Sequence, residues 1–266
     1  MRATSWADLN LPHDAKGLRS AQRAVHPDVC LEADAHDAFT KLTVLFEAPD
    51  MDLRLAKGSF KGGKVEWKFD THDQDLADLA HKAHNKIRKV KDGELWVAES
   101  SLLGTTLTNT YGDGWWFLRS FPKLDERTVV WVVKRLMAVI ALAEKAGMVH
   151  GDINKNTVAL NPSLHGLRLD GWWTSVNIGE ALQVKPDAET LTKYLRGAEV
   201  DAKLSVSQAA KMLLDNNCGV LEPLLEKFWT NPPTPQEAFQ KLDDASRTKF
   251  GKPTWHELKE PKSKGI

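Results

Sequence analysis

The sequence predicts an α+β fold in three parts: a helical hairpin over residues 1–48, a β-rich segment over 49–121 and a mainly helical segment over 122–250. Apolar residues recur at helical spacing in the first part, and short alternating runs between glycine clusters mark the second. A nearly all-apolar stretch of helical length opens the third. At roughly 150 residues per domain, the 266-residue chain corresponds to one large or two modest domains, closed by a polar tail over 251–266.

Composition excludes several classes of protein. The chain carries 36 Lys+Arg and 36 Asp+Glu, and a net charge of zero argues against general binding to nucleic acid or to a membrane surface. Its two cysteines, Cys30 and Cys218, rule out a disulfide framework and lack zinc-finger spacing, so we expect a reducing, cytoplasmic location. No apolar run of signal-peptide length begins the chain, and Lys134 and Arg135 interrupt its most hydrophobic stretch.

The first part consists of two predicted helices joined by His26-Pro27-Asp28. Asp14 is a favourable N-cap for the first helix, one face of which carries the basic residues Lys16, Arg19 and Arg23. Pro27 cannot continue this helix, and apolar residues regain helical spacing from about 33 to 46. The two apolar faces can be buried only against each other and a short lead-in, so the tripeptide lies at the tip of an antiparallel hairpin.

This pattern resembles the J-domain, the DnaJ-type co-chaperone module, in "SWADLNLP", "AKGLRSAQRAV", "HPD" and "ADAHDAFTKLTVLFE". The resemblance implies docking onto a DnaK-type chaperone and stimulation of its ATP hydrolysis through His26, Pro27, Asp28 and the three basic residues. A basic helix face can be steered to an acidic partner surface, and the Asp28 carboxylate can accept charge-assisted hydrogen bonds. The alternative is that the tripeptide only forms a turn, since Pro and Asp are common turn residues.

A long apolar helix is predicted from about Arg127 to Ala146, with Gly147 as its C-cap. The segments "MVHGDINKNTVAL" and "NPSLHGLRLDGWW" follow. They predict a loop, a short strand over 157–160, a turn, and a second strand over 167–169 that ends at Asp170-Gly171.

These segments resemble the protein-kinase-like superfamily, including its aminoglycoside and choline kinase branch. "HGD" stands where protein kinases have His-Arg-Asp, "DGW" stands where they have Asp-Phe-Gly, and the two aspartates lie 18 positions apart. The resemblance implies a bilobal fold in which Asp152 is the catalytic base and Asp170 a magnesium ligand. Thr157 occupies the position where the family has the Asn that holds a second magnesium ion. Either the loop is one residue tighter and Asn156 serves as this ligand, or the ligand is lost. His150 is expected to hold the loop by hydrogen bonds.

The β-rich segment offers weaker matches to the same family. "KVEWK" resembles the strand that carries the phosphate-binding lysine, which would be Lys68, and "KGSFKGG" precedes it without the family's glycine spacing. The following helix, predicted over 73–90, contains no glutamate, so Asp75 or Asp78 would have to pair with Lys68. No acidic residue over 204–214 matches the buried anchor that the family places in that helix.

The sequence therefore predicts a J-domain co-chaperone that recruits a DnaK-type chaperone and carries a kinase-like domain binding nucleotide or a protein client. The alternative is an active phosphotransferase, a protein kinase or an aminoglycoside-type small-molecule kinase, targeted by its J-domain. The resemblance implies ATP and magnesium as cofactors. The tryptophan pairs at 115–116 and 172–173 are expected to pack in the core rather than to stack on a ligand.

Overall fold

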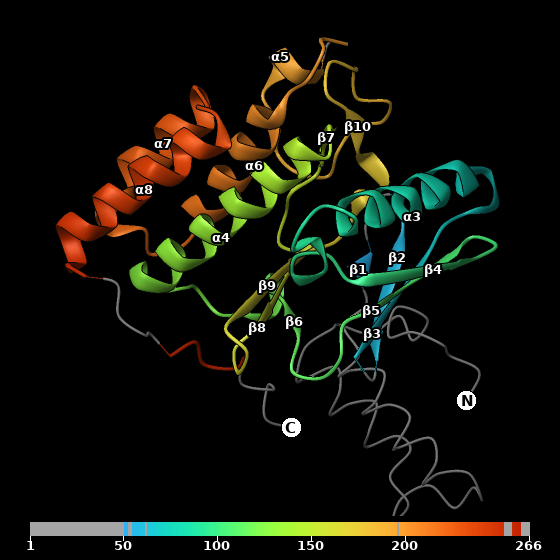
Figure 1. Ribbon diagram of the computed structural model, residues 1–266, viewed down its shortest axis with the longest axis horizontal. Coiled ribbons are helices and arrows are strands. Elements are labelled where there is room, and N and C mark those ends of the chain that lie inside the picture. Colours follow the sequence, from blue (N-terminus) through green and yellow to red (C-terminus); the bar gives the residue numbers. More distant parts are fainter. Residues whose placement is uncertain (1–50, 53–54, 62, 196, 253–256, 262–266) are drawn as a thin grey trace, which may run out of the picture.

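The computed structural model describes residues 51–52, 55–61, 63–195, 197–252 and 257–261. The predicted hairpin over residues 1–48 lies outside the described residues, together with His26, Pro27, Asp28, Lys16, Arg19 and Arg23. The described part is an α+β fold with a small sheet-containing lobe and a larger helical lobe (Figure 1).

A five-stranded antiparallel sheet forms the small lobe, in the order β1-β2-β3-β5-β4. The strands are β1 (Met51–Asp52), β2 (Lys57–Lys61), β3 (Lys64–Lys68), β4 (Glu99–Leu103) and β5 (Thr106–Thr110). In β3 the polar and apolar residues alternate, so Val65 and Trp67 are buried while Lys64, Glu66 and Lys68 are exposed. This alternation fixes which face of the sheet meets the rest of the protein.

The helix α3 (Gln74–Arg88) packs against this sheet. It buries mainly alanines on one face (Ala77, Ala80 and Ala83), which allow close approach, and it also buries His84. The helix follows η2 (Thr71–Asp73), and η3 (Gly93–Leu95) leads from it into β4. A histidine on the apolar face of α3 is therefore brought to the boundary between the lobes.

The large lobe is built around α4 (Glu126–Lys145), in which half of the residues are buried. The N-cap residue Asp125 accepts a hydrogen bond from the backbone of Thr128, and Thr234 forms a capping box with Glu237 at the start of α8. The remaining helices are α5 (Thr192–Leu195), α6 (Ala202–Leu214), η6 (Gly219–Leu221), α7 (Glu222–Thr230) and α8 (Pro235–Phe250).

Two small antiparallel sheets lie between the lobes and carry the loops of the site. One has the order β6-β8-β9 and the other pairs β7 with β10. Their bounds, with those of the neighbouring 3-10 helices, are β6 (Trp116–Phe117), η4 (Leu118–Ser120), β7 (Met148–Val149), β8 (Val158–Asn161), β9 (Gly166–Leu169), η5 (Trp172–Thr174) and β10 (Val176–Asn177). The expected strands over 157–160 and 167–169 are confirmed within one residue. Trp116 and Phe117 of β6 pair with Leu160 and Ala159 of β8.

One hydrophobic core runs through both lobes, from Ala56 and Trp67 in the small lobe to Leu242 in α8. The expectation that the tryptophan pairs are packing residues agrees with the burial of Trp115, Trp172 and Trp173. Within the described residues, no helix is long and apolar enough to cross a membrane.

Candidate active site

His150 holds together the two loops that carry the predicted acids. Its Nε2 lies 2.6 Å from the backbone oxygen of Asp170, and its Nδ1 accepts a hydrogen bond of 3.1 Å from the backbone N–H of Asp152. Because Nδ1 accepts, Nε2 must carry the proton and donate. Burial lowers the pKa of His150 to about 4, so this neutral tautomer persists at physiological pH.

Gln208 on α6 holds the loop that carries Asp152 through two hydrogen bonds to its backbone. Its Nε2 donates to the carbonyl of Gly151 at 2.7 Å and its Oε1 accepts from the backbone N–H of Ile153 at 3.1 Å. The residues that flank Asp152 are thus clamped by one buried amide. The sequence offered no acidic anchor in this helix, and a neutral side chain that both donates and accepts performs the anchoring.

Asp152 is fully buried in this loop. Its Oδ1 accepts hydrogen bonds from the backbone N–H of Ala188 at 2.5 Å and from Asn154 Nδ2 at 3.2 Å, whereas its Oδ2 is buried without a partner among the described residues. Burial raises the pKa of this carboxyl group to about 6, and the charge of Asp187 adds to the effect. The segment around Ala188 covers the carboxylate.

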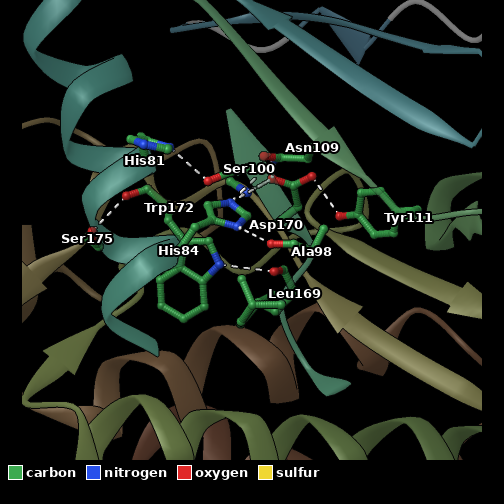
Figure 2. Close-up of polar contacts among 12 residues, drawn as sticks. His81, His84, Ala98, Ser100, Asn109, Tyr111, Leu169, Asp170, Trp172 and Ser175 are labelled. Atoms are coloured by element: carbon green, nitrogen blue, oxygen red, sulfur yellow. Dashed lines mark hydrogen bonds and ion pairs between the residues drawn. The ribbon is translucent and has the colours of Figure 1, made fainter. Parts of the chain in front are cut away.

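Asp170 lies at the meeting point of the lobes and is surrounded by donors of this chain (Figure 2). Its Oδ1 accepts from Asn109 Nδ2 and from the backbone N–H of Gly171, both at 2.7 Å, and its Oδ2 accepts from the hydroxyl of Tyr111 at 2.7 Å. His84 Nε2 lies 3.5 Å from Oδ1. The side chain is fully enclosed.

Asn156 does not reach Asp170 through any contact in the described structure. Its Oδ1 lies 3.4 Å from Arg119 Nη1, and its backbone N–H donates to Asn154 Oδ1. Thr157, at the family's usual Asn position, donates its hydroxyl hydrogen bond toward the backbone oxygens of Asp152 and Asn154. Its carbonyl accepts from the backbone N–H of Asp170 at 2.7 Å, so this position links the two acidic loops through the backbone.

Lys68 is exposed at the end of β3, opposite Thr106 of β5, and forms no ion pair with a described residue. The neighbouring positions Val65 and Trp67 point inward, and Val65 is paired with Asn109, the residue that binds Asp170. Lys68 therefore lies on the face of the sheet opposite to that site. Asp75 and Asp78 are likewise without an ion pair to Lys68.

Aromatic side chains from both lobes fill the region between β3 and the loop after Asp170. The rings of Trp67 and Trp173 have centroids 4.8 Å apart, and Phe117, in the connector between the lobes, lies 6.1 Å from both Trp67 and Tyr111. Trp67 and Trp173 are fully buried. Edge-to-face contacts at these separations add to the free energy gained by burial, so this cluster joins the lobes firmly.

Only some of the site residues predicted from the sequence lie close together in the structure. The structure brings His150, Asp152 and Asp170 together through two adjacent loops, and leaves Lys68 and Asn156 apart from Asp170. Sequence reasoning missed His84, Asn109, Tyr111 and Gln208. The signal for His84 was a histidine in an alanine-rich helix face. Asn109 and Tyr111 follow apolar Leu107 at every second position, so all three lie on the same buried face of the strand and its extension.

Comparison with solved structures identifies the fold. The kinase domain of Mycobacterium tuberculosis PknI superposes with a TM-score of 0.54 at 11% sequence identity, over 73% of this chain and 92% of that one. A point mutant of the same domain gives a TM-score of 0.52 at 13% identity, over 72% and 90% of the two chains. No family model and no curated protein sequence matches the chain. The chain therefore has a protein-kinase-like fold, which its sequence alone does not match to any family model.

Proposed function

We propose that the kinase-like part of this protein is a pseudokinase, a binding scaffold rather than a phosphotransferase. The observation that carries the proposal is the state of Asp170, whose carboxylate is enclosed and accepts three hydrogen bonds from Asn109, Gly171 and Tyr111. In a kinase-type site this carboxylate would face a magnesium ion. Here the hydrogen-bond donors of Asn109, Gly171 and Tyr111 surround the carboxylate oxygens and stand where a metal ion would have to bind.

The residues present do not fit magnesium and a triphosphate. Magnesium requires nearly octahedral oxygen coordination and usually keeps several waters, which an enclosed carboxylate cannot offer. Access to Asp170 would require breaking charge-assisted hydrogen bonds, each worth about 1.5–3 kcal/mol. Lys68 faces solvent on the other side of the sheet, and the indole of Trp67 occupies the inward position beside it.

Melting of the full-length protein with and without magnesium-ATP tests the proposal. A ligand present at 100 times its Kd stabilises the folded state by about 2.7 kcal/mol, which would raise the melting temperature by several degrees. We expect a shift below about 1 °C, and the same result for Asp170→Asn relative to its own ligand-free melt. A rise of several degrees in the natural protein that Asp170→Asn abolishes would contradict the pseudokinase proposal.

One observation favours the second candidate, an active phosphotransferase. Asp152 has an unpartnered carboxylate oxygen and a pKa raised to about 6, as a general base requires, on a loop of a kinase-like fold. This candidate predicts transfer of labelled γ-phosphate to the protein itself or to an added acceptor, lost in Asp152→Asn. Absence of transfer with both magnesium and manganese would reject it.

We further propose that residues 1–48 dock onto a DnaK-type chaperone, so that the kinase-like part presents a bound protein client to it. Support comes from the sequence: His26-Pro27-Asp28 between two amphipathic segments, with Lys16, Arg19 and Arg23 on the first. The test is stimulation of chaperone ATP hydrolysis by the full chain. His26→Gln should abolish stimulation, whereas His36→Gln, in the same region, should retain it. Equal stimulation by both variants would reject the docking proposal.

A further inference from the structure

A cavity of about 390 Å³ lies beside the large lobe, and neither Asp152 nor Asp170 lines it. Its walls come from helices α4 and α8, from the turn between β8 and β9 that carries His165, and from Trp96 after η3. The two helices pack against each other in the large lobe (Figure 1). A volume of this size lies in the range of small-molecule sites.

The walls combine aromatic rings with cations. The ring of Trp131 stacks on that of His165, with centroids 4.5 Å apart and planes inclined by 31°. The Arg135 guanidinium lies over Trp96 and Trp131, at 5.4 and 6.0 Å from the two ring centroids. Arg127 lies over Phe250 at 4.5 Å. Planar apolar surface is therefore available directly beside positive charge.

The charge of the cavity is one-sided. Its lining includes Arg127, Lys134, Arg135 and Lys252 and contains no Asp or Glu among the residues that the structure describes. Asp243 is paired with Lys134 and Arg247, and no described residue forms an ion pair with Arg127, Arg135 or Lys252. The low-dielectric aromatic walls strengthen the attraction of these cations for an anion.

The aromatic walls and the cations indicate the kind of ligand together. Flat rings offer contact area to a planar apolar body, and Arg135 and Lys252 beside them, which have no ion pair among the described residues, attract an anionic group. Shape and charge therefore point to the same class of ligand.

We propose that this cavity binds a small amphiphilic anion, a planar apolar body bearing a carboxylate, sulfonate or phosphate group. The rings of Trp96, Trp131 and Phe250 contact the apolar body. Arg135 and Lys252 neutralise the anionic group. The site is distinct from the acidic loops, since its lining contains neither Asp152 nor Asp170.

A pair of fluorescent probes tests the proposal on the full-length protein. The first, 1-anilinonaphthalene-8-sulfonate, is an aromatic anion, and N-phenyl-1-naphthylamine has the same rings without the sulfonate. We expect saturable binding of one anionic probe per chain, at least about tenfold tighter than the neutral probe, as one charge-assisted hydrogen bond of about 1.4 kcal/mol provides. Equal affinity for the two probes, or no saturable binding, would overturn the proposal.

Variants locate the binding. Arg135→Met keeps the length of the side chain and should weaken the anionic probe about tenfold, and Ala138→Phe should fill the cavity and abolish binding. The same charge change at exposed Lys89, on the C-cap of α3, is the matched control and should leave binding unchanged. Circular dichroism and melting establish that each variant is folded. Unchanged affinity in folded Arg135→Met and in folded Ala138→Phe would overturn the site.

Displacement of the anionic probe identifies the head group and tests the other occupants. Naphthalene-2-carboxylate or 2-naphthyl phosphate should displace the probe, and neutral 2-naphthol should not. Failure of both anions to displace it would contradict the proposal. A concentration-dependent dimer that Ala138→Phe abolishes, without probe binding, would assign the cavity to a second copy of the chain instead.

Discussion

Burial and hydrogen bonding act in opposite directions on Asp170. Enclosure alone would raise the pKa of its carboxyl group, but the contacts with His84, Tyr111 and Asn109 outweigh burial and the pKa is lowered. The stability that the ionised group contributes is therefore present above the pKa of the unfolded chain and is lost as the pH falls through the lower, folded-state pKa. Asp170 is an ionised structural centre at neutral pH.

Tyr111→Phe tests this role. The hydroxyl of Tyr111 donates to Asp170 at 2.7 Å, and burial with the nearby carboxylate raises the tyrosine pKa well above 10, so it remains a donor. Its loss removes a hydrogen bond to a buried charge, and we expect urea unfolding to give a free energy lower by about 1.5–3 kcal/mol. Tyr194→Phe, the same change at the other tyrosine, should cost less than about 0.5 kcal/mol. Equal losses would contradict the role of Asp170.

Asp152 should show the opposite dependence on pH. Its folded-state pKa, about 6, lies above the ordinary value of 3.8, so the folded state binds a proton more tightly and the natural protein loses stability as the pH rises from about 4 to 6. Asp152→Asn does not titrate and can still accept the hydrogen bond from Ala188. Its stability relative to the natural protein should therefore increase across this window, by about 2–3 kcal/mol for a shift of two units.

Urea unfolding of both proteins at pH 4, 5, 6 and 7 measures this difference. Asp75→Asn, at an exposed position of α3, corrects for the general effect of removing one negative charge. A stability difference between Asp152→Asn and the natural protein that stays constant over this range would show that the carboxylate is not desolvated in solution.

The sequence predicted the two acidic loops but not how each acid is used. His150, Asp152 and Asp170 belong to short local motifs. In the structure these motifs form two neighbouring loops that His150 joins by hydrogen bonds. The partners of Asp170 lie far from it in sequence, since Asn109 and Tyr111 precede it by about 60 residues. Asn109 and Tyr111 reach Asp170 only because their face of β5 and its extension points toward the core. The pairing of β5 with β3 sets this direction, and the local sequence around either residue does not.

Among the elements, α6 contributes to the site through one residue. Gln208 is buried and bridges the backbone of Gly151 and Ile153 across the Asp152 loop, and it also donates to Thr190 Oγ1 at 2.8 Å. The helix thereby connects the acidic loop to the segment that covers it.

Gln208→Met should remove the hydrogen bonds of this side chain to the Asp152 loop and to Thr190, with little change in side-chain volume. A buried carbonyl and a buried N–H would lose their partners, and we expect the free energy of unfolding to fall by about 2–4 kcal/mol. Amide hydrogen exchange at Ile153 should accelerate more than exchange in α4. Gln240→Met on the exposed face of α8 is the matched control, expected to cost about 0.5 kcal/mol or less. A loss equal to that of the control would mean that α6 does not anchor the loop.

Strand β3 shows why the predicted lysine site was not assembled. The range 64–68 was predicted to be a strand and is one, with the alternation that places Lys68 and its alternate neighbours outside. The resemblance to a lysine-bearing strand depended on composition, whereas the direction of each side chain depends on register. The pairing of Val65 with Asn109 fixes that register and turns Trp67 toward the core.

At the scale of the whole molecule, one hydrophobic core runs through both lobes of the described part of the chain. The rings of Trp67 and Phe69 from the small lobe contact Trp173, at centroid distances of 4.8 and 5.6 Å. Asp170 adds hydrogen bonds to Asn109 and Tyr111 across the same boundary. These aromatic contacts and hydrogen bonds fasten the small lobe to the large one.

We therefore expect the two lobes to unfold as one cooperative unit. Tryptophan fluorescence reports on ten tryptophans that include Trp67 and Trp173 of the cluster between the lobes, and far-ultraviolet circular dichroism reports mainly on the helices of the large lobe. In urea, both signals should follow a single transition with the same midpoint and the same slope, because the shared core couples the lobes. Trp173→Phe keeps an aromatic ring but leaves a cavity, so it should lower both midpoints together. Separate midpoints for the two probes, or a shift confined to the fluorescence transition, would show that the lobes are independently stable and that a nucleotide cleft can open between them.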